Sequence, residues 1–104
     1  MAQIKGRSVS IEQILREKRD DVRRIAAKHG AYNIRVFGSV VRGEVKPESD
    51  IDLLVDVGPT TSSWFPAGLI LDLEALLGFR VEVVTERALN PDIRGYVLRE
   101  AVQL

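Results

Sequence analysis

Residues 38–52 read GSVVRGEVKPESDID, a Gly-Ser turn followed after ten residues by two aspartates one residue apart. Asp50 and Asp52 open an apolar run over residues 51–57 that predicts a β-strand, in which every second side chain points to the same face. Their carboxylates therefore share a face, with Cα atoms roughly 6 to 7 Å apart. Because like charges at this separation repel, the pattern predicts a cation between them, and Mg²⁺ is the hard, oxygen-seeking candidate.

The patterns around this stretch predict one α/β domain over residues 1–104, with a small mixed sheet of about three strands and helices packed on it. The expected order is α-β-β-α-β-α. A capping box of Ser10 and Gln13 starts a first helix over about residues 10–29, and the core would span about residues 30–104. The other expected elements are strands at 34–37, 51–57 and 80–85, a helical turn at 40–43, and helices beginning near residues 66 and 90.

A third acid, Glu82, lies on the predicted strand over residues 80–85. If this strand pairs beside the one that carries the aspartates, Glu82 projects toward them. Three such acids are what metal-dependent nucleotidyl transfer needs: Asp50 and Asp52 hold Mg²⁺ ions that neutralise the nucleotide phosphates, and Glu82 completes the site beside the acceptor hydroxyl. Asp56 has the same parity but lies farther along its strand, and it is interpreted as solvated or as a salt-bridge partner.

The Gly-Ser pair predicts a phosphate-binding turn. Gly38 and Ser39 follow a predicted strand, and a sharp turn there points backbone N–H groups outward, where they can hold the β- and γ-phosphates of a nucleotide. Arg42 lies one helical turn on and adds positive charge to the same phosphates, with a salt bridge to Glu44 or Glu48 as the alternative. The predicted nucleotide-binding residues are Gly38, Ser39, Arg42 and Ser49, the last orienting an aspartate or capping the loop.

Composition limits the classes of protein to which the chain can belong. The chain has 104 residues, no cysteine and no apolar run long enough to span a membrane, which excludes disulfides and thiolate catalysis and makes the cytoplasm the expected location. Residues 1–42 carry ten Lys/Arg against four Asp/Glu, and residues 43–104 carry five against eleven. A basic half can attract phosphates, nucleic acid or an acidic partner. The favoured interpretation is that the charges on the first helix only keep the chain soluble, and no nucleic-acid partner is expected.

The motif GSVVRG followed by SDIDLLV resembles the signature of the DNA polymerase β-type nucleotidyltransferases, and in particular of the minimal nucleotidyltransferase (MNT) branch. The helix that follows and the strand RVEVV are similar to that family too, so the resemblance covers about residues 30–104. Two departures stand out: Val41 replaces a common alanine, and Glu82 replaces what is often an aspartate. The resemblance implies the polymerase β-type fold, a site of Asp50, Asp52 and Glu82 that holds two Mg²⁺ ions, and ATP as donor.

The MNT branch also implies a partner. Its members resemble antitoxins of HEPN/MNT toxin–antitoxin modules, here a type VII-like system, in which AMP is transferred from ATP to a tyrosine of the HEPN-domain toxin. Hetero-oligomers with the toxin are then expected. The short chain favours an external acceptor, because larger relatives that modify small molecules carry a further helical domain.

Two alternatives remain open at this level. A binding module would neutralise the toxin by occlusion, with an idle nucleotide site. A small-molecule nucleotidyltransferase would turn over ATP and a metabolite without a protein partner.

Overall fold

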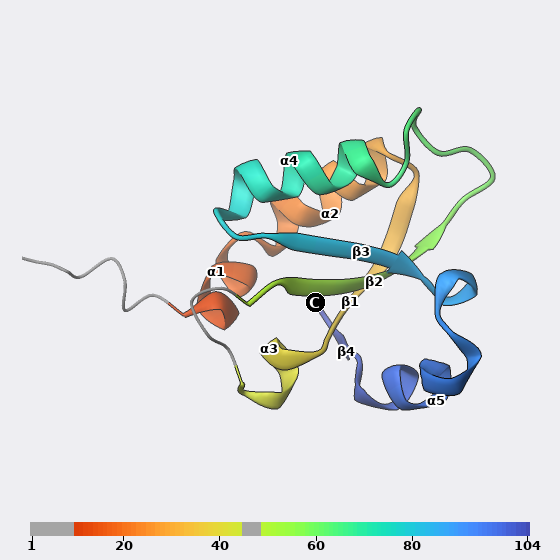
Figure 1. The fold of residues 1–104 in the computed structure, drawn as a ribbon. Coiled ribbons are helices and arrows are strands. Elements are labelled where there is room, and N and C mark those ends of the chain that lie inside the picture. The colour runs from red at the N-terminus through yellow and green to blue at the C-terminus, as the bar shows by residue number, and fades with distance from the viewer. Residues whose placement is uncertain (1–9, 45–48) are drawn as a thin grey trace, which may run out of the picture.

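The computed structural model describes residues 10–44 and 49–104, which form a four-stranded sheet with helices on both faces (Figure 1). The sheet has the order β3-β2-β1-β4. Its strands are β1 (Ala31–Phe37), β2 (Ile51–Val57), β3 (Val81–Thr85) and β4 (Val102–Gln103). Strand β1 pairs antiparallel with β2 and β4, and β2 pairs parallel with β3. The expected mixed sheet is confirmed, but the count of about three strands was one too low.

The sequence did not predict the fourth strand because β4 has only two residues. It follows the last helix directly and pairs with Arg35 and Val36 on β1. Both of its residues are exposed, so no alternation of buried and exposed side chains indicates a strand there. Its pairing is a consequence of where the last helix ends.

The helices are α1 (Ile11–Glu17), α2 (Arg19–Lys28), α3 (Ser39–Arg42), α4 (Ala67–Leu77) and α5 (Pro91–Glu100), with a 3₁₀ turn, η2, at Glu86–Ala88. The predicted cap at Ser10 is present, and its hydroxyl accepts the N–H of Gln13 at 3.0 Å. The single first helix expected over residues 10–29 is instead two helices, because Lys18 leaves the helical conformation at ψ 13°. This break lets α1 and α2 each bury an apolar stripe against the same sheet.

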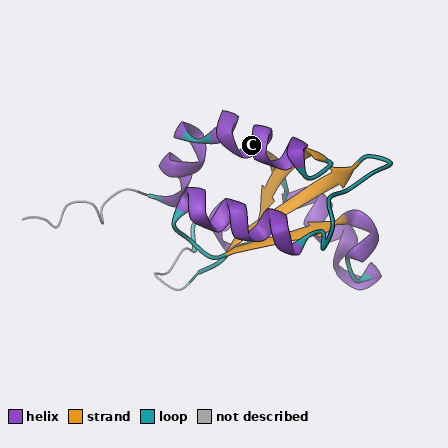
Figure 2. Cartoon of the chain, turned by 90° about the horizontal axis from the view of Figure 1, so that it is seen from above, coloured by secondary structure: helices purple, strands orange, loops and turns teal. Residues whose placement is uncertain are grey.

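The two faces of the sheet carry different cores. One face packs under α1, α2 and α4, through fully buried side chains such as Ile51, Leu53 and Leu69. The opposite face packs against α5 through a smaller cluster centred on Leu54, Leu89 and Val97. Figure 1 shows α2 and α4 above the sheet and α5 below it, and Figure 2 looks down on the upper helices where they lie over the strands.

The α5 face is the one that carries the predicted site. Alternation along β2 sends Ile51, Leu53 and Val55 to the larger core, so Asp52, Leu54 and Asp56 point to the α5 side. A smaller core on this side leaves part of the sheet surface available to polar groups. Within the described residues, no helix is both long and apolar enough to cross a bilayer.

Candidate functional site

The site forms where one strand ends and two others begin. Antiparallel pairing places Phe37, the last residue of β1, opposite Asp52 near the start of β2. Parallel pairing places Glu82 on β3 beside Asp52 on its other side. Paired residues of neighbouring strands point to the same face, so the two carboxylates project side by side. The predicted convergence of Asp52 and Glu82 is thereby realised by the register of the sheet.

The electrostatics of Asp52 reflect this crowding. The side chain is partly buried, and burial, the nearby Glu82 and then Asp50 raise its pKa to about 6. The carboxylate is thus held where its own charge is disfavoured. No hydrogen-bond donor or ion-pair partner for it is found among the described residues.

The first aspartate of the motif is arranged differently. Asp50 lies just before β2, and its Oδ1 is 3.3 Å from Nε of Arg80, a residue that directly precedes β3 and whose side chain is 77% exposed. In the parts of the chain that the structure describes, no three acidic, histidine or cysteine side chains are gathered tightly enough to hold a metal ion as they stand. An exposed pair of this kind contributes only about 0–1 kcal/mol, so a cation could replace the arginine at little cost.

The turn after β1 depends on glycine. Gly38 has φ +80°, a left-handed conformation that side chains disfavour. A Cβ at this position would also overlap Oδ2 of Asp52. The glycine therefore allows the turn to pass directly beside the aspartate. Ser39 follows as the first residue of α3, which brings its hydroxyl-bearing side chain into the same turn.

The N–H of Gly38, which the sequence predicts to face a phosphate, is donated to Oε1 of Glu100 at 2.8 Å. Arg42 lies at the end of α3 and forms two ion pairs, from Nε to Oε1 of Glu44 at 2.9 Å and from Nη1 to Oε2 of Glu100 at 2.8 Å. The hydrogen bonds that Arg42 donates to Glu44 and then to Glu100 raise its pKa above its ordinary value. Arg42 therefore forms the salt bridge with Glu44 that was the alternative to a phosphate contact.

Two of the predicted positions in the intervening loop have different outcomes. Ser49 is partly buried immediately before Asp50. Glu48, the other predicted partner for Arg42, lies outside the described residues. The prediction that the loop serine orients an aspartate or caps the loop stays a prediction.

Sequence reasoning missed Glu100. It is the last residue of α5, about 50 positions from the aspartates, and no local spacing connects it with the Gly-Ser turn. One signal was available: a glutamate in the last turn of a helix is opposed by the helix dipole. Such a residue needs compensation from elsewhere, and here it comes from Gly38 and Arg42.

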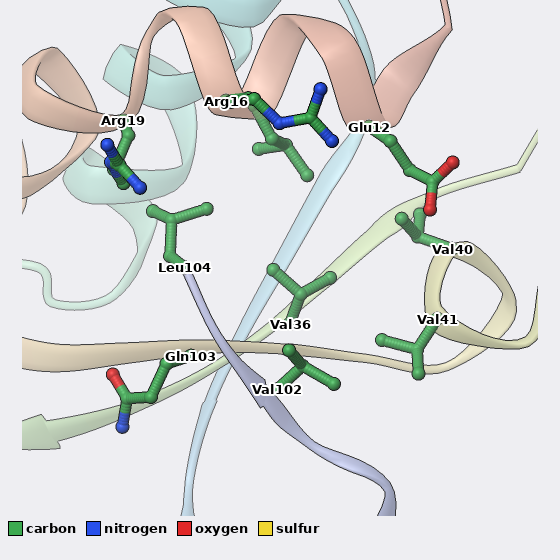
Figure 3. A pocket seen from close by; sticks show the side chains of 10 residues that line it. Glu12, Arg16, Arg19, Val36, Val40, Val41, Val102, Gln103 and Leu104 are labelled. Carbon is green, nitrogen blue, oxygen red and sulfur yellow. The ribbon is translucent and has the colours of Figure 1, made fainter.

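A separate hollow of about 300 Å³ lies on the other side of α3, between α1 and β4. Figure 3 shows its apolar wall, with Arg16 and Arg19 on the helical side. None of the three predicted acids lines it. The wall is formed mainly by Leu15, Val36, Val40, Val41, Val102 and Leu104.

Comparison with known proteins identifies the class of protein to which this fold and site belong. The chain belongs to the nucleotidyltransferase domain family, whose model matches residues 11–104. It is 44% identical over 92 residues to the protein adenylyltransferase MntA of Thermococcus cleftensis, a match that covers 88% of this chain and 90% of that protein. The resemblance to the nucleotidyltransferases is thereby confirmed, and the chain is a nucleotidyltransferase by family.

Solved structures agree with this assignment. A structure assigned as a minimal nucleotidyltransferase superposes with a TM-score of 0.79 at 47% identity, over 93% of this chain and 98% of that one. A mutant of the toxin–antitoxin complex MntA–HpeT matches with a TM-score of 0.58 at 25% identity, over 93% of this chain and 72% of that one. The expected polymerase β-like fold and the MNT branch are both supported.

Proposed function

We propose that this chain is an antitoxin that transfers AMP from ATP, with Mg²⁺, to a tyrosine of a HEPN-domain toxin partner. One observation carries the proposal: the register of three strands sets Asp52 and Glu82 side by side, next to a turn that only glycine can form. The kinship to MntA, a protein adenylyltransferase, supports the reaction. The match to a chain of the MntA–HpeT complex supports a toxin partner.

The donor set fits magnesium. Asp50, Asp52 and Glu82 offer only carboxylate oxygens, which are the ligands that Mg²⁺ prefers. The pKa of Asp52, raised to about 6 by burial and by its acidic neighbours, indicates negative charge without compensation at the centre of the set. Asp50 would exchange its exposed partner Arg80 for the ion. Bound there, magnesium would neutralise the phosphates of the nucleotide.

The Gly-Ser turn and α3 would hold the phosphates. Ser39 supplies a hydroxyl at the start of α3, and Arg42 supplies a guanidinium with five N–H donors, of which Nε and Nη1 are in use. Its Nη2 makes no hydrogen bond to any described residue and would be open to a phosphate oxygen. Ser49 would orient the neighbouring Asp50. These groups favour departure of pyrophosphate by stabilising its negative charge.

The proposed reaction uses these positions. The tyrosine oxygen of the partner attacks the α-phosphorus in line, a new P–O bond forms, and the bond to the α,β-bridging oxygen breaks with its electron pair leaving on pyrophosphate. Glu82, on the acceptor side, receives the hydroxyl proton. The cytoplasm, where ATP and magnesium are plentiful, is the proposed location.

Intact-mass measurement of the toxin tests the proposal. The toxin is incubated with this chain, ATP and Mg²⁺, and we expect its mass to rise by one or more adenylyl groups. The double variant D50N/D52N should leave the mass unchanged. The matched control D20N/D21N removes two exposed carboxylates from the first turn of α2 and should transfer AMP normally.

The intact-mass measurement, together with a cell-protection assay and a pyrophosphate-release assay, separates the alternatives. An occluding antitoxin would protect cells from the toxin even as D50N/D52N, and the toxin would keep its original mass. A small-molecule nucleotidyltransferase would release pyrophosphate in the presence of a metabolite and leave the toxin unmodified. Either outcome would refute transfer to the partner.

A further inference from the structure

Glu100 links the last helix to the proposed phosphate-binding turn. Its side chain is only 10% exposed, although it ends a helix at the surface. Oε1 accepts the N–H of Gly38 at 2.8 Å, and Oε2 accepts Nη1 of Arg42 at 2.8 Å and the hydroxyl of Tyr96 at 3.2 Å. Both carboxylate oxygens are therefore engaged, and two of the three donors belong to residues of the turn.

The surroundings of Glu100 destabilise its ionised carboxyl, and the groups that contact it must compensate for this. Burial disfavours the ionised carboxyl and by itself raises its pKa, and the carbonyl end of α5 opposes a negative charge. The hydrogen bond from Gly38 and the guanidinium of Arg42 outweigh the effect of burial, so that the pKa of Glu100 lies below its ordinary value. A carboxylate held in this way is fixed in orientation, because each of its oxygens has a defined donor.

We propose that Glu100 is a positioning residue for the nucleotide: it fixes the peptide of Gly38 and the guanidinium of Arg42 so that the turn is shaped for a polyphosphate before ATP arrives. The inference rests on the proposed function, since it assumes that this turn receives phosphates. In this assignment Gly38 contributes shape, while its N–H serves Glu100. The phosphate contacts are left to Ser39 and to the remaining donors of Arg42.

Geometry favours positioning over competition with the nucleotide. Glu100 occupies only Nη1 of the guanidinium, and Nη2 has no bond to any described group. A planar guanidinium that is held at two of its three nitrogens, Nε and Nη1, presents the third in a fixed direction. Restricting the rotamers of a long side chain before binding lowers the entropic cost of binding.

Three variants test the role of Glu100. E100A removes both contacts with the turn, whereas E100Q keeps an amide oxygen that can accept the N–H of Gly38 but loses the charge that faces Arg42. The control E86Q makes the same chemical change in an ion pair with Arg35, which lies 3.5 Å away near the other end of β2. Binding of a non-hydrolysable ATP analogue with Mg²⁺ is measured by calorimetry without the partner, and kcat and KM for ATP are measured with it.

We expect E100A to weaken nucleotide binding and to raise KM for ATP by about tenfold or more, since a hydrogen-bonded charge is lost from the turn. The kcat at saturating ATP should change far less. E100Q should fall between E100A and the wild type, and E86Q should match the wild type. Thermal melting of each variant reports its folded fraction.

Four results would overturn the positioning role. A lower KM in E100Q would mean that the carboxylate competes with phosphate, and an unchanged KM with a lower melting temperature in both Glu100 variants would mean that the contact serves stability alone. If the wild type binds no magnesium nucleotide at millimolar concentration, the proposed function falls together with this inference. If the wild type binds nucleotide and transfers AMP while E100A does so equally well, only the inference falls.

Discussion

Strand β2 carries an acid near each end on the same face of the sheet, and the groups around the two acids have opposite charge. At the far end, Oδ1 of Asp56 is 2.8 Å from Nη2 of Arg35, and its Oδ2 accepts Nδ2 of Asn33 at 2.9 Å. At the near end, Asp52 has acidic neighbours and a pKa raised to about 6, with burial the largest cause. The sequence spacing of the two aspartates alone does not predict this difference.

The comparison teaches how to separate a structural carboxylate from a functional one. Arg35 is only 12% exposed and lies between Asp56 and Glu86, so the charge of Asp56 has a cationic partner within the fold. The interpretation of Asp56 as a salt-bridge partner is thereby confirmed. The charge at Asp52 and Glu82 has no such neutralisation in the described residues, and it calls for a cation from solution.

The sharpest way to break the comparison is to remove the charge at the near end. Asp52→Asn should lower the rate of AMP transfer by about a thousandfold, because the nucleotide phosphates lose the centre of their counter-ion site. Asp56→Asn should keep most of the rate. Radiolabelled AMP transfer to the toxin measures both, and similar rates for the two variants would remove the distinction between the ends.

The next effect concerns the turn beside Asp52. Gly38→Ala should reduce the transfer rate by about a hundredfold and destabilise the fold by about 1–2 kcal/mol, because a Cβ there meets the aspartate and the backbone is left-handed. Gly78→Ala is the matched control: its φ is +77°, but a Cβ there meets nothing within 4 Å. It should be destabilised by no more than Gly38→Ala in urea denaturation and keep its activity. Equal loss of activity in both variants would contradict the assignment.

Removing the cation at the far end of β2 should lower stability and leave activity unchanged. Arg35→Met leaves Asp56 and Glu86 without their shared cation and should destabilise the chain by about 1–2 kcal/mol, a value reduced by the partial exposure of both acids. The transfer rate per folded molecule should be unchanged. Chemical denaturation and an activity assay on the folded fraction measure the two quantities, and a raised KM for ATP would show that the ends are coupled.

The smallest effect is a dependence of stability on pH. Without metal or nucleotide, the folded chain keeps the proton of Asp52 up to about pH 6, whereas the ordinary value of 3.8 applies when it unfolds. A raised pKa means that ionisation favours unfolding, so wild-type stability should fall as pH rises from about 4 to 6 relative to Asp52→Asn. The difference in melting temperature should therefore grow across this window and level off above it. A constant difference would show that Asp52 is not perturbed.

Much of the site could be predicted because its signals are local. The Gly-Ser turn, the alternation that puts Asp50 and Asp52 at the start of a strand, and the parity of Glu82 all follow from short stretches of sequence. Long-range features could not be predicted in this way. The pairing of Arg80 with Asp50, the short β4 and the contact of Glu100 with Gly38 each depend on where elements far apart in the chain come to lie.

Sequence alone determined the three longer strands, the motif and the chemical types of the groups, since periodicity and turn chemistry act over a few residues. Tertiary structure decided which acids are neutralised and which are not. The reason is that charge compensation depends on distances across strands and from α5 to the turn, and only the register of the sheet sets those distances. Asp52 and Asp56 share one strand and one face, and the neighbours brought to each by folding make one a proposed ligand and the other a structural ion pair.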